Sequence, residues 1–171
     1  IGYYAFRDCT SLQSLEIPNS VTEIGYYAFR DCTSLQSLEI PDSVTQIDGS
    51  SFSGCNNLTS IIVSKNNSRY KSTNNCILTK DGKKLVLSRN HNILDSVTEI
   101  GDYAFSGCTS LKSIMIPNSV TSIGEFAFNC CTSLQSIDIP DSVTQINGTI
   151  FSDCNNLTSI IVSKNNSRYK S

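Results

Sequence analysis

The sequence predicts an α/β solenoid: a right-handed superhelix with a concave parallel β-sheet, short turns and helical segments on its convex side, and one inserted β-hairpin. Three observations lead to this expectation. The chain repeats itself every 23 residues, the apolar residues of each repeat keep one spacing, and an Asp-Gly pair between two apolar runs interrupts the repetition once. Units this short must stack on copies of themselves to bury their apolar faces, which favours recognition over catalysis.

The 23-residue period is clearest at the start of the chain. Residues 1–9 read Ile-Gly-Tyr-Tyr-Ala-Phe-Arg-Asp-Cys and return unchanged as residues 24–32. A larger duplication contains this one, because residues 1–72 correspond to residues 100–171 after a shift of 99. The sequence therefore predicts two duplicated halves within a single solenoid.

The predicted solenoid covers residues 1–171, with residues 73–99 as an inserted segment between the halves. The chain opens in the middle of a repeat and shows no polar capping unit at either end. We therefore expect a fragment of a longer array whose open ends allow end-to-end self-association.

Each unit carries the spacing Leu-x-x-Leu-x-Ile of a leucine-rich repeat, first at Leu12, Leu15 and Ile17. The last two apolar positions flank one outward residue, as the alternation of a strand requires. The four prolines directly follow these segments, where a missing N–H ends the ladder of hydrogen bonds. We expect six short parallel strands, with turns and short helical segments in the second half of each unit.

The inserted segment contains the strongest local turn signal in the chain. Asp81-Gly82 stands between the apolar runs Ile77-Leu78 and Leu85-Val86-Leu87. Both turn positions tolerate positive φ, so this pattern is typical of a β-hairpin. We expect the hairpin to protrude from the solenoid.

Composition excludes several functional classes. The chain has a net charge of -2 and a pI near 5.3, which gives no global attraction to nucleic acid or to an anionic membrane. No run approaches the roughly 18 apolar residues of a membrane span. The chain has a single histidine, His91, so its serines lack a base for nucleophilic catalysis. The cysteines form no Cys-x-x-Cys pair, so their spacing does not suit zinc. We expect no enzyme, cofactor, metal site, nucleic-acid partner or membrane insertion in this segment.

The eight cysteines admit two interpretations. Six recur at one repeat position, where stacking places equivalent Cα atoms roughly 5 Å apart and a disulfide ladder is conceivable. The favoured interpretation is that they are small buried apolar residues with free thiols, because neighbouring side chains in such a ladder point the same way. Cys76 and Cys130 lie off the ladder and are the two to test for reactivity.

The outward positions of the predicted strands form two columns on the concave face, which is the expected ligand-binding surface. The first is a serine column: Ser14, Ser37, Ser60, Ser113, Ser136 and Ser159. The second is a mixed column: Glu16, Glu39, Ile62, Met115, Asp138 and Ile161. The alternative is that the serines only stack and the acids only keep the face soluble. The exposed apolar members favour ligand contact, because a contiguous apolar patch exposed on a sheet face is typical of an interaction site.

Basic residues gather around the inserted segment. Seven of the thirteen lie between positions 65 and 89: Lys65, Arg69, Lys71, Lys80, Lys83, Lys84 and Arg89. Such a patch attracts sulfated glycans or acidic partner surfaces, with an effect that fades with salt. The alternative is that the hairpin simply carries solvated charges.

The repeat pattern Leu-x-x-Leu-x-Ile-Pro-x-Ser-Val-Thr-x-Ile-Gly-x-x-Ala-Phe-x-x-Cys resembles the BspA-like, or Treponema pallidum-type, leucine-rich repeat. The segment from Asn66 to Ser72, followed by Lys-Asp-Gly, resembles a recurrent break of that family. The resemblance implies a curved solenoid found in surface proteins of bacteria and of mucosal protists such as Trichomonas and Entamoeba. Several of these proteins adhere to host matrix proteins or to other microbes. The resemblance supplies no catalytic residues.

These features together predict a non-catalytic recognition module. We expect a cell-surface or secreted adhesin whose concave face binds a protein or glycan ligand of the extracellular matrix or of a cell surface. The alternative is an intracellular scaffold for protein–protein interaction, in which the reduced cysteines stay buried.

Overall fold

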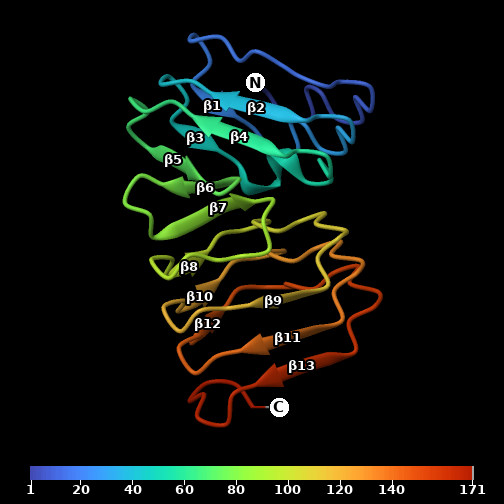
Figure 1. The fold of residues 1–171 in the computed structure, drawn as a ribbon, viewed down its shortest axis with the longest axis vertical. Helices are drawn as coiled ribbons and strands as arrows, with labels where there is room; N and C mark the ends of the chain where they lie inside the picture. The colour runs from blue at the N-terminus through green and yellow to red at the C-terminus, as the bar shows by residue number, and fades with distance from the viewer. Residues whose placement is uncertain (171) are drawn as a thin grey trace.

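The computed structural model describes residues 1–170 as a solenoid of about six stacked coils (Figure 1). The two termini lie at opposite ends of the stack. Strands one repeat apart in the sequence pair with each other, so each coil lies against the next. The solenoid and its parallel sheets confirm the predicted fold class.

The first set of strands comes from the Leu-x-x-Leu-x-Ile segments. Strands β2 (Ser37–Ile40) and β4 (Ser60–Val63) form one parallel pair, and β9 (Ser113–Met115), β11 (Ser136–Ile139) and β13 (Ser159–Val162) form a three-stranded parallel sheet. We call the outward surface of these five strands the strand face. Five of the six predicted strands therefore exist. Residues 12–17 carry no strand, although Ile17 is buried and the Gln36 N–H donates to the Gln13 carbonyl at 2.9 Å.

The second half of each unit differs from the sequence-based expectation. Two-residue strands pair in parallel here, and we call them together the second ladder: β1 (Glu23–Ile24) pairs with β3 (Gln46–Ile47), and β10 (Ser122–Ile123) pairs with both β8 (Glu99–Ile100) and β12 (Gln145–Ile146). The one helix within residues 1–170 is a short 3-10 turn, η1 (Gly49–Phe52). The helical share is therefore much smaller than expected, because the inward Ile of each unit is held by a sheet rather than by a helix.

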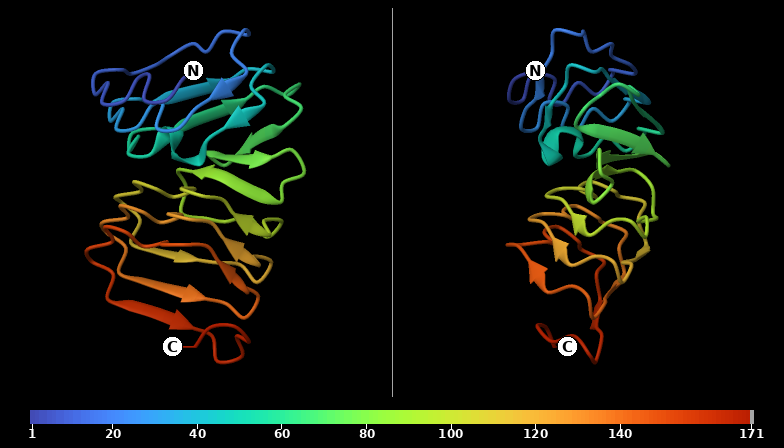
Figure 2. Two further views of the ribbon diagram at one scale, coloured as in Figure 1. Left: turned by 180° about the vertical axis from the view of Figure 1, so that it is seen from behind. Right: turned by 90° about the vertical axis from the view of Figure 1, so that its left-hand side faces the viewer.

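Strands β6 (Cys76–Thr79) and β7 (Lys84–Ser88) of the inserted segment pair antiparallel with each other, and β6 also pairs antiparallel with β5 (Tyr70–Thr73) at the end of the first half. The predicted hairpin exists between β6 and β7, but the expectation that it protrudes is wrong. Strand β7 pairs in parallel with β8, so the hairpin continues the second ladder as a six-stranded sheet within the stack (Figure 2). Its apolar side chains cover both faces of the sheet, and burying both faces is more favourable than exposing either.

The two faces of the hairpin serve two cores. Ile77 and Leu87 pack into the core of the N-terminal half, and Leu78 and Leu85 pack into the core of the C-terminal half. All four side chains are buried. The hairpin is therefore a wall shared by both halves.

Stacked phenylalanines run through each core. Ring centroids lie 5.1 Å apart for Phe6 and Phe29 and 5.3 Å apart for Phe29 and Phe52. The pair Phe105 and Phe128 repeats the first distance in the other half. Each buried ring contributes roughly 1.5–3 kcal/mol before entropy is subtracted, so every coil stabilises its neighbours.

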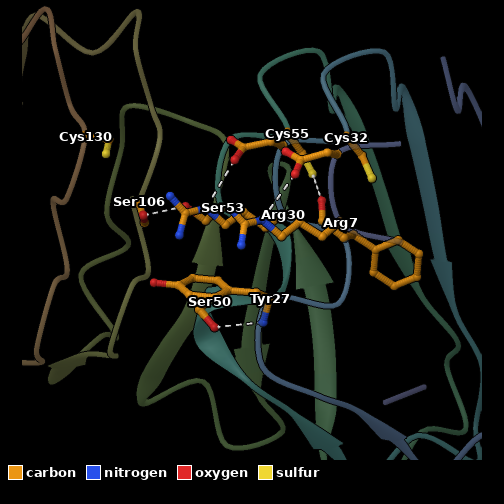
Figure 3. A network of polar contacts seen from close by, with 12 residues as sticks. Arg7, Tyr27, Arg30, Cys32, Ser50, Ser53, Cys55, Ser106 and Cys130 are labelled. Carbon is orange, nitrogen blue, oxygen red and sulfur yellow. Dashed lines mark hydrogen bonds and ion pairs between the residues drawn. The ribbon is translucent and has the colours of Figure 1, made fainter. Parts of the chain in front are cut away.

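Neighbouring coils also join directly at the edge opposite the inserted strands. The hydroxyl groups of Ser53 and Ser106 lie 2.7 Å apart although 53 residues separate them in the chain (Figure 3). A Cβ on Gly107 would collide with the backbone of Gly54, so position 107 requires glycine; a Cβ on Gly54 would collide with the Asp31 side chain. The two halves therefore contact each other directly at this edge, although the inserted segment separates them in the sequence.

Candidate binding surfaces

The strand face presents the predicted columns in register. Ser37 lies opposite Ser60, and Ser136 lies between Ser113 and Ser159. In the mixed column Glu39 faces Ile62, and Asp138 lies between Met115 and Ile161. Strands β2, β4, β9 and β11 alternate outward and buried residues, which directs these side chains outward. Strand β13 departs from this pattern, because Ile160 and Ile161 are both exposed.

The columns do not form one continuous surface. The sheet of β2 and β4 and the sheet of β9, β11 and β13 share no pairing, and strands β5, β6 and β7 lie between them in the stack. Ser14 and Glu16 extend the first block from the coil that lacks a strand, and an isolated bridge joins Asn92 to Met115 in the second. The structure thus divides the expected surface into two blocks.

Exposed apolar side chains distinguish the strand face. Met115 is 83% exposed, and Ile62 and Ile161 are 52% and 53% exposed. Each stands in the mixed column beside a carboxylate residue. The face therefore offers apolar contact area together with negative charge.

Two grooves open where the strands run into the following turns. Groove A, of about 320 Å³, is lined by Glu16, Ile17, Pro18, Asn19, Glu39, Ile40, Pro41, Asp42 and Ser64. Groove B, also of about 320 Å³, is lined by Met115, Ile116, Asn118, Asp138, Ile139, Pro140, Asp141, Ile161 and Ser163. The mixed column therefore borders concave sites rather than a flat sheet.

Six of the seven basic residues between positions 65 and 89 gather around the hairpin turn. The Lys80 ammonium donates to the carbonyls of Lys65 and Asn67, at 3.1 and 2.7 Å. The Lys84 ammonium lies 2.5 Å from the Glu99 carboxylate. The side chains of the exposed residues Lys65, Arg69 and Lys83 enter no ion pair within residues 1–170, so they carry the available charge; half-buried Lys71 lies near Gly82.

Arg89 lies apart from this group, at the other end of β7. Its guanidinium is hydrogen-bonded to the carbonyls of Phe52 and Ser88 and to the Cys108 sulfur. Phe52 is 37 residues away in the chain. Arg89 therefore connects the hairpin to the N-terminal coils rather than facing a ligand.

The cysteines are largely internal. Cys32, Cys55, Cys76, Cys108 and Cys131 are buried, and no disulfide links any cysteine of the described chain. The Cys32 thiol donates to the Phe6 carbonyl at 3.0 Å, and the Cys55 thiol donates to the Phe29 carbonyl at 3.1 Å. Burial raises the pKa of the Cys76 thiol, and burial together with the Asp153 carboxylate raises that of Cys130.

An aromatic edge lies outside the sequence-based site predictions. Tyr27 packs near Tyr4 and Tyr103, at 5.7 and 5.9 Å between ring centroids. The Arg30 guanidinium lies 4.5 Å from the Tyr27 ring centroid and donates to Asp31 (Figure 3). The signal was present in the sequence, because Tyr4, Tyr27 and Tyr103 hold the same position in their repeats.

No group of three or more His, Cys, Asp or Glu residues is arranged to hold a metal ion within residues 1–170. No helix in that range is long and apolar enough to cross a membrane.

Comparison with known proteins places these surfaces in a family context. The BspA type leucine rich repeat region, in six copies, matches residues 1–80 and 84–171. A leucine-rich repeat protein of Eubacterium ventriosum superposes with a TM-score of 0.83 at 31% identity, over 94% of this chain and 44% of that one. The pneumococcal vaccine antigen PcpA superposes with a TM-score of 0.64 at 18% identity, over 91% of this chain and 52% of that one. No curated protein matches. The chain spans about half the length of these two solved proteins.

Proposed function

The chain belongs to the BspA-type leucine-rich repeat family, and from this premise we propose that it is a non-catalytic module that binds a partner protein or glycan through the strand face. The observation that carries the proposal is the mixed column, in which a largely exposed Met115 and exposed Ile62 and Ile161 stand beside carboxylates. Apolar side chains in such a position favour contact with a partner.

The proposed partners are extracellular matrix components or cell-surface ligands, and the proposed location is the cell surface or the secreted fraction. The name of PcpA, a pneumococcal vaccine antigen of the same fold, is in keeping with such a location. Affinity would come from many weak contacts along the two blocks, because each exposed polar contact contributes only a little.

Binding to a panel of matrix proteins and sulfated glycans tests this proposal. The variant E39A/M115A/D138A removes three outward side chains of the strand face. The control E23A/Q46A/Q145A removes three exposed side chains of the second ladder. We expect at least tenfold weaker binding for the first variant and unchanged binding for the control. Equal binding by both variants would contradict the proposal.

The basic residues at the hairpin turn provide a secondary contact in this proposal. Lys65, Arg69 and Lys83 carry the available charge, so K65A/R69A/K83A should elute from immobilised heparin at lower salt than the parent protein. K84A is the matched control, because Glu99 already pairs with Lys84. Identical elution of the triple variant and the parent would remove this contact from the proposal.

The buried thiols favour a second candidate, an intracellular scaffold, because reducing compartments keep such thiols free. Antibody labelling of intact source cells, before and after permeabilisation, separates the two. Signal on intact cells supports the adhesin, and signal only after permeabilisation supports the scaffold.

A further inference from the structure

We propose that grooves A and B, at equivalent positions of the two halves, are two subsites of different preference for cationic segments of a partner protein. Groove A selects two neighbouring Lys or Arg side chains, and groove B selects one such side chain next to an apolar one. The inference rests on the proposed function, because both grooves open on the strand face and share residues of its mixed column.

The two grooves are copies of one site. After the shift of 99 residues, six lining residues of groove A meet identical residues in groove B. The pairs are Ile17 with Ile116, Asn19 with Asn118, Ile40 with Ile139, Pro41 with Pro140, Asp42 with Asp141, and Ser64 with Ser163. The duplication thus produced the same cradle twice.

The chemistry differs at the two outward strand positions, which lie between the residues that the two grooves share. Groove A has Glu16 and Glu39, where groove B has Met115 and Asp138. Ile161 adds a second apolar side chain to groove B. The shared lining residues are therefore the same in both grooves, and the outward strand residues set which side chains of a partner each groove prefers.

Charge complementarity identifies the occupant. Neither groove has a Lys, Arg or His in its lining, whereas groove A has three carboxylates and groove B has two. The ion pairs within residues 1–170 join Arg7 to Asp8, Arg30 to Asp31, and Lys84 to Glu99, so the groove carboxylates have no cation of their own. Lys65 and Lys164 follow the last lining residue of each groove and mark the end of the negative surface.

The size of the grooves also limits the occupant. A volume of about 320 Å³ is at the lower end of the range for ligand sites and accommodates a few side chains. Groove B places the 83% exposed Met115 next to Asp138 and Asp141. This pairing suits a segment in which an apolar residue adjoins a basic one.

Two synthetic peptides of equal length with blocked termini probe the grooves. One contains Lys-Lys and the other Leu-Lys, and amide shifts of the 15N-labelled chain report which groove each peptide occupies. We expect Lys-Lys to bind groove A about threefold more tightly than groove B, and Leu-Lys to prefer groove B by a similar factor, in line with the small energy of exposed pairs.

Swap variants supply the matched control. E16M/E39D gives groove A the outward residues of groove B, and M115E/D138E does the reverse. These residues are exposed, so both variants should fold, as circular dichroism will check. We expect each swap to move the preference of the altered groove and leave the other groove unchanged.

Two results would overturn the inference: a Glu-Glu peptide that binds the grooves as well as Lys-Lys does, or preferences that ignore the swaps. If E39A/M115A/D138A still loses the matrix ligand in that case, the proposed function stands without this inference. If the peptides behave as expected while that variant keeps its ligand, the grooves bind cationic segments and the proposed function fails.

Discussion

At the scale of single residues, small polar side chains connect one coil to the next. Asn67 is fully buried, and its amide donates to the carbonyls of Pro41 and Val44 at 2.8 and 2.9 Å. Its carbonyl oxygen accepts from the N–H groups of Arg69 and Tyr70. One side chain thus satisfies four backbone groups, and Asn166 repeats the arrangement in the second half.

The Asn67→Ala variant tests this role. Loss of the amide leaves buried backbone groups without partners, so we expect the free energy of unfolding to fall by about 2–4 kcal/mol. Urea denaturation measures the change. Asn66→Ala is the control, because Asn66 is exposed and should change the stability by about 0.5 kcal/mol or less. Equal stability of the two variants would show that the four bonds are unimportant.

Cys130 allows a prediction about pH. Its thiol lies 3.8 Å from the Asp153 carboxylate, and burial with this charge raises its pKa. A raised pKa means less thiolate at pH 8, so Cys130 should react with a disulfide reagent more slowly than an ordinary thiol and speed up only at higher pH. Asp153→Asn should accelerate the reaction, whereas Asp8→Asn, at the same repeat position in a distant coil, should not. An unchanged rate in Asp153→Asn would contradict the assigned cause.

At the scale of the elements, the inserted hairpin is a wall between two cores. Side chains from one face enter the N-terminal core and side chains from the other enter the C-terminal core. Its strands also continue the second ladder through β8. The insertion therefore joins the duplicated halves rather than decorating them.

Replacing Leu85 by Ala tests the wall. Leu85 is 2% exposed, so the substitution leaves a cavity and should lower the free energy of unfolding by about 2–5 kcal/mol. Lys83→Ala changes an exposed residue of the same hairpin and should alter stability by about 0.5 kcal/mol or less. If Leu85→Ala is as stable as Lys83→Ala, the hairpin does not support the core.

Much of this architecture could be predicted from local patterns. Strand β2 follows from the alternation of Leu38 and Ile40 with outward residues, and the β6–β7 turn follows from Asp81-Gly82. Where the hairpin packs depends on cores supplied by distant repeats, which no local pattern contains. The two-residue strands were missed because their apolar spacing is irregular and their pairing is set by stacking.

The candidate surfaces also include parts that local sequence patterns predict and parts that depend on distant repeats. The columns follow from the repeat spacing, because each strand places the same position outward. The grooves form between turns of neighbouring coils, so they could not be read from one unit. Sequence position alone groups Arg89 with the lysines, yet its partner Phe52 comes from a coil 37 residues earlier.

At the scale of the whole molecule, the stack is continuous from end to end. The Ser53–Ser106 contact closes one edge across the insertion, and the hairpin closes the other side. Neighbouring units in a solenoid stabilise each other, so coupling across this junction should make the two halves unfold together.

Buried thiols report this coupling. Cys32 belongs to the N-terminal core and Cys131 to the C-terminal core, and both are buried. We expect both to become reactive at the same urea concentration, as mass spectrometry of labelled peptides will measure. Two separate midpoints would show that the halves are independent.

The binding role of the strand face can be tested most directly at Met115, the only methionine of the chain. Its 83% exposed side chain should be oxidised rapidly by dilute peroxide in the free protein. With a bound ligand retained from the matrix panel, we expect the rate of sulfoxide formation, followed by peptide mapping, to fall at least tenfold. An unchanged rate in the saturated complex would contradict binding at the strand face.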